Sequence, residues 1–153
     1  MTKILFICHG NICRSPMAEF IFRDMVAARG LSDRFSIASC ATSAEEIGNP
    51  VHPGTVRILS AHNISCKGKR AIQLTKSDRD RYDLFIGMDY RNIQNMCRIL
   101  GSAADDKIHR LLDFTDRPRD ISDPWYTGNF NQTYDDVVSG CTALLSQLLS
   151  GEV

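Results

Sequence analysis

A nine-residue segment constrains the fold of this chain most strongly. Residues 8–16, CHGNICRSP, directly follow residues 4–7, which are all strongly apolar. An apolar run without alternation is typical of a central parallel strand, which is buried on both faces. Gly10 and Asn11 tolerate the unusual dihedrals of a tight loop, and Ser15 as N-cap with Pro16 as first helical residue predicts a helix start. The chain is therefore predicted to pass from a buried strand through a tight loop into a helix.

The same segment has the residue types of an anion site. A cysteine at a strand end, five residues and then an arginine can wrap backbone N–H groups around a tetrahedral oxyanion, with the positive end of the next helix directed into the loop. Arg14 offers a fork of donors that a lysine would not reproduce. The positive field favours the thiolate of Cys8, which is the species that attacks. We predict a phosphate-binding loop with Cys8 as nucleophile, made of Cys8, His9, Gly10, Asn11, Ile12, Cys13, Arg14 and Ser15.

Composition argues against several classes of function. Eighteen acidic and eighteen basic residues cancel, so no overall field favours nucleic acid or a membrane surface as a partner. The apolar N-terminal run is too short for a secretory signal or a membrane span, which predicts a cytoplasmic protein. The six cysteines are expected to be reduced rather than paired in a disulfide framework. Neither they nor the histidines have metal-ligand spacing, so no metal is expected.

The chain alternates strand and helix patterns within one expected domain, residues 1–153, a length that can bury one core. Strands are predicted at residues 4–7, 35–39, 83–87 and, more weakly, 108–112. Helices are predicted at residues 16–29, 53–62 and 90–100, and along an apolar stripe from 134 to 148. This alternation implies right-handed crossovers and a doubly wound, three-layer α/β/α fold around a four-stranded parallel sheet. The longest irregular segment, residues 113–132, is a candidate functional loop.

Ligands bind beyond the carboxyl ends of the strands in such sheets. Cys8 lies at that end of the first predicted strand, and Ser39, Asp89 and Asp123 lie in or beside the segments that follow later strands. We therefore expect these three side chains to gather around Cys8.

Several motifs resemble one known family when they are taken together and in order. They are the loop from Cys8 to Arg14 with its Ser15-Pro16 pair, Ser39-Cys40-Ala41-Thr42, Met88-Asp89 and Asp123-Pro124-Trp125-Tyr126. Over nearly its whole length the chain resembles the low-molecular-weight protein tyrosine phosphatase family. The resemblance implies a phosphotyrosine phosphatase I-like fold and hydrolysis of phosphotyrosine through a cysteinyl phosphate, with no cofactor. It also implies tyrosine-phosphorylated protein or peptide substrates, inorganic phosphate as product and a monomer.

The leaving tyrosine oxygen needs a proton, and four aspartates could supply it: Asp113, Asp116, Asp120 and Asp123. Asp123 is preferred because Pro124 biases its backbone to extended geometry, which fixes the direction of the side chain. From the residues alone a turn aspartate is an equally good interpretation, since Asp-Pro is common in turns. The resemblance favours the catalytic role, so Cys8, Arg14 and Asp123 are the predicted catalytic residues.

Other residues of the predicted site have supporting roles. Asn11 is expected to hold the loop through its own hydrogen bonds, and the resemblance implies that Ser39 supports it. Ser15 is either only a helix cap or also a hydroxyl that stabilises the Cys8 thiolate as leaving group. Cys13 is either a small filler or a redox partner that traps oxidised Cys8 as a disulfide. The expected substrate rim consists of Ile12, Glu45, Trp125 and Tyr126.

Two positions depart from the pattern of the family. Lys69 stands about where many members have a histidine that helps to hold the phosphate loop, and residues 67–70 are otherwise typical of a solvated charged loop. Glu45 lies near where several members have an aromatic rim residue, so Trp125 is expected to supply the ring. Together with Glu46, Glu45 predicts an acidic mouth that disfavours acidic peptides.

Three other functions can use the same loop. Arsenate reductases of similar fold relay oxidation through two further cysteines close together on a mobile segment, but Cys66 and Cys97 are far apart in the sequence. Related protein arginine phosphatases carry a threonine four residues after the nucleophile, where this chain has Ile12, an apolar wall suited to a phenyl ring. A non-catalytic phosphopeptide-binding module needs neither a nucleophile nor an acid, which argues against that function here.

Overall fold

Four parallel strands form one sheet in the order β2-β1-β3-β4 in the computed structural model, which describes residues 1–153. The strands are β1 (Thr2–Cys8), β2 (Phe35–Ala41), β3 (Leu84–Gly87) and β4 (Ile108–Arg110). The helices are α1 (Arg14–Ala28), α2 (Pro53–Ala61), α3 (Tyr90–Leu100), α4 (Pro124–Thr127) and α5 (Phe130–Ser150). The predicted α/β fold with a four-stranded parallel sheet is confirmed.

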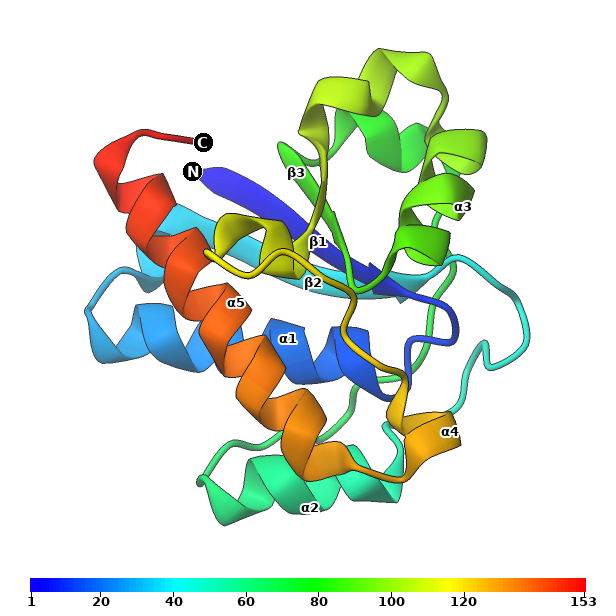
Figure 1. The fold of residues 1–153 in the computed structure, drawn as a ribbon, viewed down its shortest axis with the longest axis vertical. Coiled ribbons are helices and arrows are strands. Elements are labelled where there is room, and N and C mark those ends of the chain that lie inside the picture. The colour runs from blue at the N-terminus through cyan, green and yellow to red at the C-terminus, as the bar shows by residue number, and fades with distance from the viewer.

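Strand β1 is central, and its side chains separate two layers of the core. Ile4 and Phe6 pack in a cluster with residues of α1 and α5, whereas Leu5 and Ile7 pack in a second cluster with residues of α3. Successive strand residues point to opposite faces, so an unbroken apolar run is what a strand covered on both faces requires. Figure 1 shows α1 and α5 on one side of the sheet with α2 beyond them, and α3 on the other side.

The start of α1 differs from the prediction. The helix begins at Arg14, with Cys13 in the N-cap position and no capping side chain, so the prediction that Ser15 caps it is wrong. Ser15 is fully buried, and its hydroxyl lies 3.0 Å from the sulfur of Cys8. The side chain that would have capped the helix is instead directed back at the end of β1, because the loop turns tightly between the two elements.

The segment after β4 also differs from the prediction. The strand ends at Arg110 rather than at residue 112, because the next four residues form a short 3₁₀ turn that buries two leucines in the core near α5. Helix α4, inside the segment expected to be irregular, was not predicted, since a helix of four residues is too short to show an apolar period.

None of the helices combines the length and apolarity needed to cross a membrane.

Candidate active site

The loop between β1 and α1 leaves a row of backbone donors free. The N–H groups of residues 9–13 donate no hydrogen bond within the protein. Asn11 has a positive φ of 59°, the left-handed conformation that asparagine tolerates better than most residues. The loop is held instead through its carbonyl oxygens, since Cys8, His9 and Ile12 accept hydrogen bonds from the backbone of later segments. Free N–H groups beside a helix N-terminus form an anion-binding concavity.

Cys8 is almost completely buried at the end of β1, with 3 % of its surface exposed. Its sulfur lies 3.0 Å from the Ser15 hydroxyl and accepts a hydrogen bond of 3.4 Å from the Ser15 backbone N–H. Hydrogen bonds directed at a thiolate favour the charged form. The first turn of α1 therefore places two hydrogen-bonding groups at the Cys8 sulfur.

Arg14 links the phosphate loop to two acidic segments. Its guanidinium donates to Asp89 at 2.6 Å, to the Ile121 carbonyl at 2.9 Å and to Asp123 at 3.4 Å. Burial alone would lower the pKa of Arg14, but the neighbouring Cys8, Asp89 and Asp123 outweigh it and raise that pKa. The Nε atom is buried and has no hydrogen-bond partner in the protein. One donor of a permanently charged fork is therefore left for an anion.

Asp123 is held at the N-cap of α4. Its backbone is extended, at φ −77° and ψ 115°, as expected for a residue before proline. One carboxylate oxygen accepts a hydrogen bond from the Trp125 N–H at 3.1 Å, and the other faces Arg14. The side chain is a quarter exposed, so it can reach a molecule that enters from solvent.

A cavity of about 110 Å³ joins these groups. Its walls are formed by Cys8, His9, Gly10, Ile12, Cys13, Arg14, Glu45, Glu46, Asp123, Trp125 and Tyr126. The structure thus brings the three predicted catalytic residues and all four predicted rim residues to one opening. Trp125 and Tyr126 are 57 % and 82 % exposed, while His9 and Glu45 pair across the mouth at 3.0 Å.

The chain matches a family model over residues 3–152, described as low molecular weight phosphotyrosine protein phosphatase. The chain belongs to this family. Low molecular weight protein-tyrosine-phosphatase YfkJ of Bacillus subtilis is 41 % identical over 150 residues, which cover 97 % of this chain and 96 % of that protein.

Several solved structures share the fold. The crystal structure of YfkJ has a TM-score of 0.96 and 40 % identity, and covers 100 % of this chain and 98 % of its own. SP-PTP of Streptococcus pyogenes has a TM-score of 0.88 and 41 % identity, with 97 % and 93 % covered. The Drosophila arginine phosphatase DARP has a TM-score of 0.87 and 26 % identity, with 96 % and 98 % covered.

In this phosphatase, Asn11 is the hub of a buried network. Its amide donates to the hydroxyls of Ser15 at 2.8 Å and Ser39 at 2.9 Å, and its oxygen accepts the Ile72 N–H at 3.2 Å. Ser39 in turn donates to Glu19 at 2.6 Å. These hydrogen bonds join Asn11, Ser15, Ser39 and Glu19 into one connected network, so the backbone of the loop is held rigid around Asn11.

Sequence reasoning missed Glu19 and the role of Asp89. Glu19 lies on α1, four residues after Ser15, and this spacing places both side chains on one helix face. Asp89 was expected near Cys8 but without a role, and it accepts the short hydrogen bond from Arg14. The spacing of four residues between Ser15 and Glu19 was the one signal in the sequence that could have revealed Glu19.

Lys69 is not part of a solvated loop, although residues 67–70 were expected to be one. Its ammonium donates to the Ser39 carbonyl at 2.8 Å and lies 3.8 Å from a carboxylate oxygen of Glu19. Only 11 % of its side chain is exposed, and burial lowers the pKa of Lys69. Lys69 thus contacts the same network as the phosphate loop.

Lys69→Ala should lower the free energy of unfolding by about 1–3 kcal/mol, because a buried carbonyl loses its donor and Glu19 loses a neighbouring cation. Urea denaturation would measure the change. Lys67→Ala is the matched control, since Lys67 is exposed two residues earlier and its side chain forms no ion pair. Equal stability of the two variants would contradict a supporting role for Lys69.

Burial, together with the nearby Cys8 and Asp123, raises the pKa of Cys13 to about 12. Cys13 is therefore a neutral thiol around neutral pH and does not compete with Cys8 for the positive field. All six cysteines are unpaired. The redox role of Cys13 stays a prediction.

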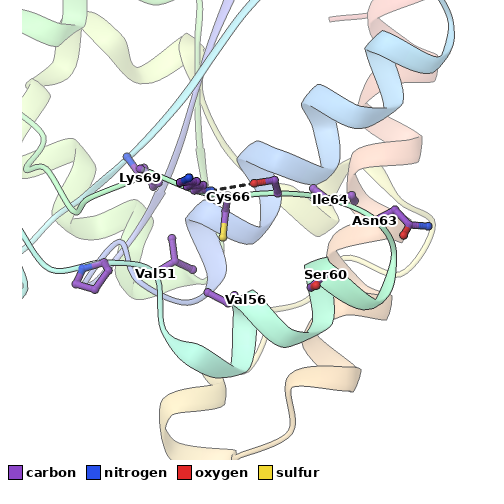
Figure 2. A pocket seen from close by; sticks show the side chains of 11 residues that line it. Val51, Val56, Ser60, Asn63, Ile64, Cys66 and Lys69 are labelled. Atoms are coloured by element: carbon purple, nitrogen blue, oxygen red, sulfur yellow. Dashed lines mark hydrogen bonds between the residues drawn. The ribbon is translucent and has the colours of Figure 1, made fainter.

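A second, larger cavity of about 600 Å³ lies away from these residues, between α2 and residues 63–69. Figure 2 shows Val51 and Val56 on one side of it and the sulfur of Cys66 directed into it. It contains no residue predicted for catalysis, and Lys69 at its edge is its link to the phosphate loop.

Proposed function

We propose that this phosphatase hydrolyses phosphotyrosine in proteins or peptides, with Cys8 as nucleophile, Arg14 as phosphate ligand and Asp123 as acid and base. The free N–H groups of residues 9–13 carry the proposal, because they belong to the loop that joins the buried Cys8 to Arg14, at a cavity that Asp123 also lines. Because these donors are already in place, the protein does not have to reorganise when negative charge develops on the phosphate oxygens.

In the first step the Cys8 thiolate attacks phosphorus in line, so that a sulfur–phosphorus bond forms while the bond to the tyrosine oxygen breaks. Asp123 gives its proton to that oxygen, and neutral tyrosine leaves. The loop N–H groups and Arg14 stabilise the charge on the three equatorial oxygens. No metal takes part in this step.

In the second step water attacks the cysteinyl phosphate. Asp123, now a carboxylate, takes the proton of the attacking water, and Cys8 leaves as a thiolate. The Ser15 hydroxyl at 3.0 Å and the Ser15 N–H stabilise the departing sulfur. Inorganic phosphate is the product, and the proton taken from water returns Asp123 to the protonated state in which it started.

The walls of the site favour an aromatic substrate over phosphoarginine. Ile12 forms an apolar wall beside Cys8, and the exposed ring of Trp125 can flank a phenyl ring. Glu45 and Glu46 at the mouth disfavour acidic peptides. We expect residues 1–153 to act as one domain and as a monomer in the cytoplasm.

Phosphate release from a phosphotyrosine peptide, measured with chelator and reductant present, tests this function. The same peptide sequence carrying phosphoarginine or phosphoserine provides the comparison, and arsenate reduction is assayed in parallel. We expect release from phosphotyrosine to exceed release from the other two by at least about 100-fold, as a site shaped for one leaving group allows. No release from folded enzyme would overturn the tyrosine assignment, and faster release from phosphoarginine would replace it.

A further inference from the structure

The segment that carries Asp123 has little regular structure to hold it. Residues 115–123 form neither helix nor strand. Between residues 116 and 122 the backbone makes one backbone–backbone hydrogen bond, from the Ile121 N–H to the Met88 carbonyl at 2.9 Å. The contacts of Asp123 itself, to Trp125 and at 3.4 Å to Arg14, are local or long. Other groups must therefore fix where this segment lies against the phosphate loop.

Asp120 makes the strongest side-chain contacts of that segment with the sheet edge. A single oxygen, Oδ1, accepts the backbone N–H of Tyr90 at 2.9 Å and the guanidinium of Arg110 at 2.9 Å. Tyr90 is the first residue of α3, directly after Asp89, and Arg110 is the last residue of β4. One carboxylate oxygen thus ties the segment to the ends of two different elements.

These contacts are continuous with Arg14. Ile121 directly follows Asp120; its N–H donates to the Met88 carbonyl and its own carbonyl accepts a hydrogen bond from the Arg14 guanidinium. The same guanidinium also donates to the carboxylate of Asp89. Residues 120 and 121 are therefore held against residues 88–90 and against the Arg14 guanidinium. Asp123, the proposed acid, lies only two residues after Ile121.

We infer that Asp120 is a positioning residue for the reaction, which holds Asp123 where it can protonate the leaving oxygen. This inference rests on the proposed function. The side chain of Asp120 is 52 % exposed, so its ion pair contributes little to global stability. Its effect is expected on geometry, because a displacement of about 1 Å in a catalytic group can cost about 100-fold in rate.

Asp120→Ala tests this, assayed on two small substrates, free phosphotyrosine and para-nitrophenyl phosphate. Nitrophenolate is a weak base that leaves with little protonation, so a misplaced acid should matter less for it. We expect kcat/KM to fall about tenfold or more for phosphotyrosine and less than about threefold for the nitrophenyl ester. Neither substrate has flanking residues that could contact Asp120 as part of a peptide.

Asp120→Asn separates the hydrogen bonds from the charge. Its amide oxygen can accept both donors that Oδ1 accepts now, so this variant should keep the wild-type ratio between the two substrates. Asp113→Ala is the matched control, because Asp113 is an exposed carboxylate that also pairs with Arg110 and lies at a distance in sequence from the acid. Asp120→Glu, with a longer arm, gives an intermediate selective loss and replaces the alanine variant if that one fails to fold.

Equal losses on both substrates, or no loss, would overturn the positioning role of Asp120. Equal damage from the asparagine and alanine variants would overturn it too, by showing that charge rather than hydrogen bonding matters. A wild-type enzyme without activity on phosphotyrosine would overturn the proposed function and the positioning role with it. An active wild type with unselective variants would overturn the positioning role alone.

Discussion

Cys8→Ser should abolish phosphate release from a phosphotyrosine peptide, with a loss on the order of 10⁴-fold or more, as when the nucleophile of a covalent mechanism is removed. The serine hydroxyl stays protonated at neutral pH and cannot replace a thiolate that the Ser15 hydroxyl and N–H stabilise. The change in volume is small, so the fold should be retained. Steady-state phosphate release with reductant present would measure the loss.

The same variant should still bind the product. The free N–H groups of residues 9–13 and the Arg14 guanidinium are unchanged by the substitution, so added phosphate should raise the melting temperature of the variant as it does for wild type. Cys97→Ser is the control, because Cys97 is a partly exposed thiol outside the site. Measurable turnover by Cys8→Ser would argue against a cysteinyl-phosphate intermediate, and equal loss in Cys97→Ser would point to general sensitivity of the fold.

Asp123→Asn should lower kcat/KM for phosphotyrosine by about 10²–10³-fold, the range for loss of a general acid. Asparagine is a good N-cap and can still accept the Trp125 N–H, so α4 should form as before. The loss should be smaller for para-nitrophenyl phosphate, because its leaving group needs less protonation. Initial rates at low substrate concentration give kcat/KM for both substrates.

Asp116→Asn is the matched control for this substitution. Asp116 lies in the same irregular segment, is exposed and has no ion pair. It should retain wild-type kcat/KM on both substrates. If Asp116→Asn were as damaged as Asp123→Asn, or if Asp123→Asn lost the same factor on both substrates, Asp123 would not be the proton donor.

Local patterns predicted most of the framework correctly. The unbroken apolar run of residues 4–7 predicted a strand buried on both faces, and Ile4 and Leu5 do lie in separate core clusters. The helix predicted over residues 90–100 matches the bounds of α3, because Asp89 provides a capping box before an amphipathic stretch. Such features succeed because the deciding interactions lie within a few residues of one another.

Short elements escaped prediction for the same reason. Helix α4 has four residues, and the extra turn after β4 depends on leucines that pack near α5, far along the chain. Neither has enough local pattern to be recognised without its tertiary neighbours.

The sequence alone determined the kind of site: a cysteine, a tight loop and an arginine at a strand end, together with an aspartate before proline, define its chemistry by residue type and spacing. Only the tertiary structure decided how these parts are held. The hydrogen bonds of Asp120 with Tyr90 and Arg110, like that of Lys69 with Ser39, join segments that are far apart in the sequence. Their physical basis is that hydrogen bonds between distant segments depend on where the sheet brings those segments together, which no local spacing records.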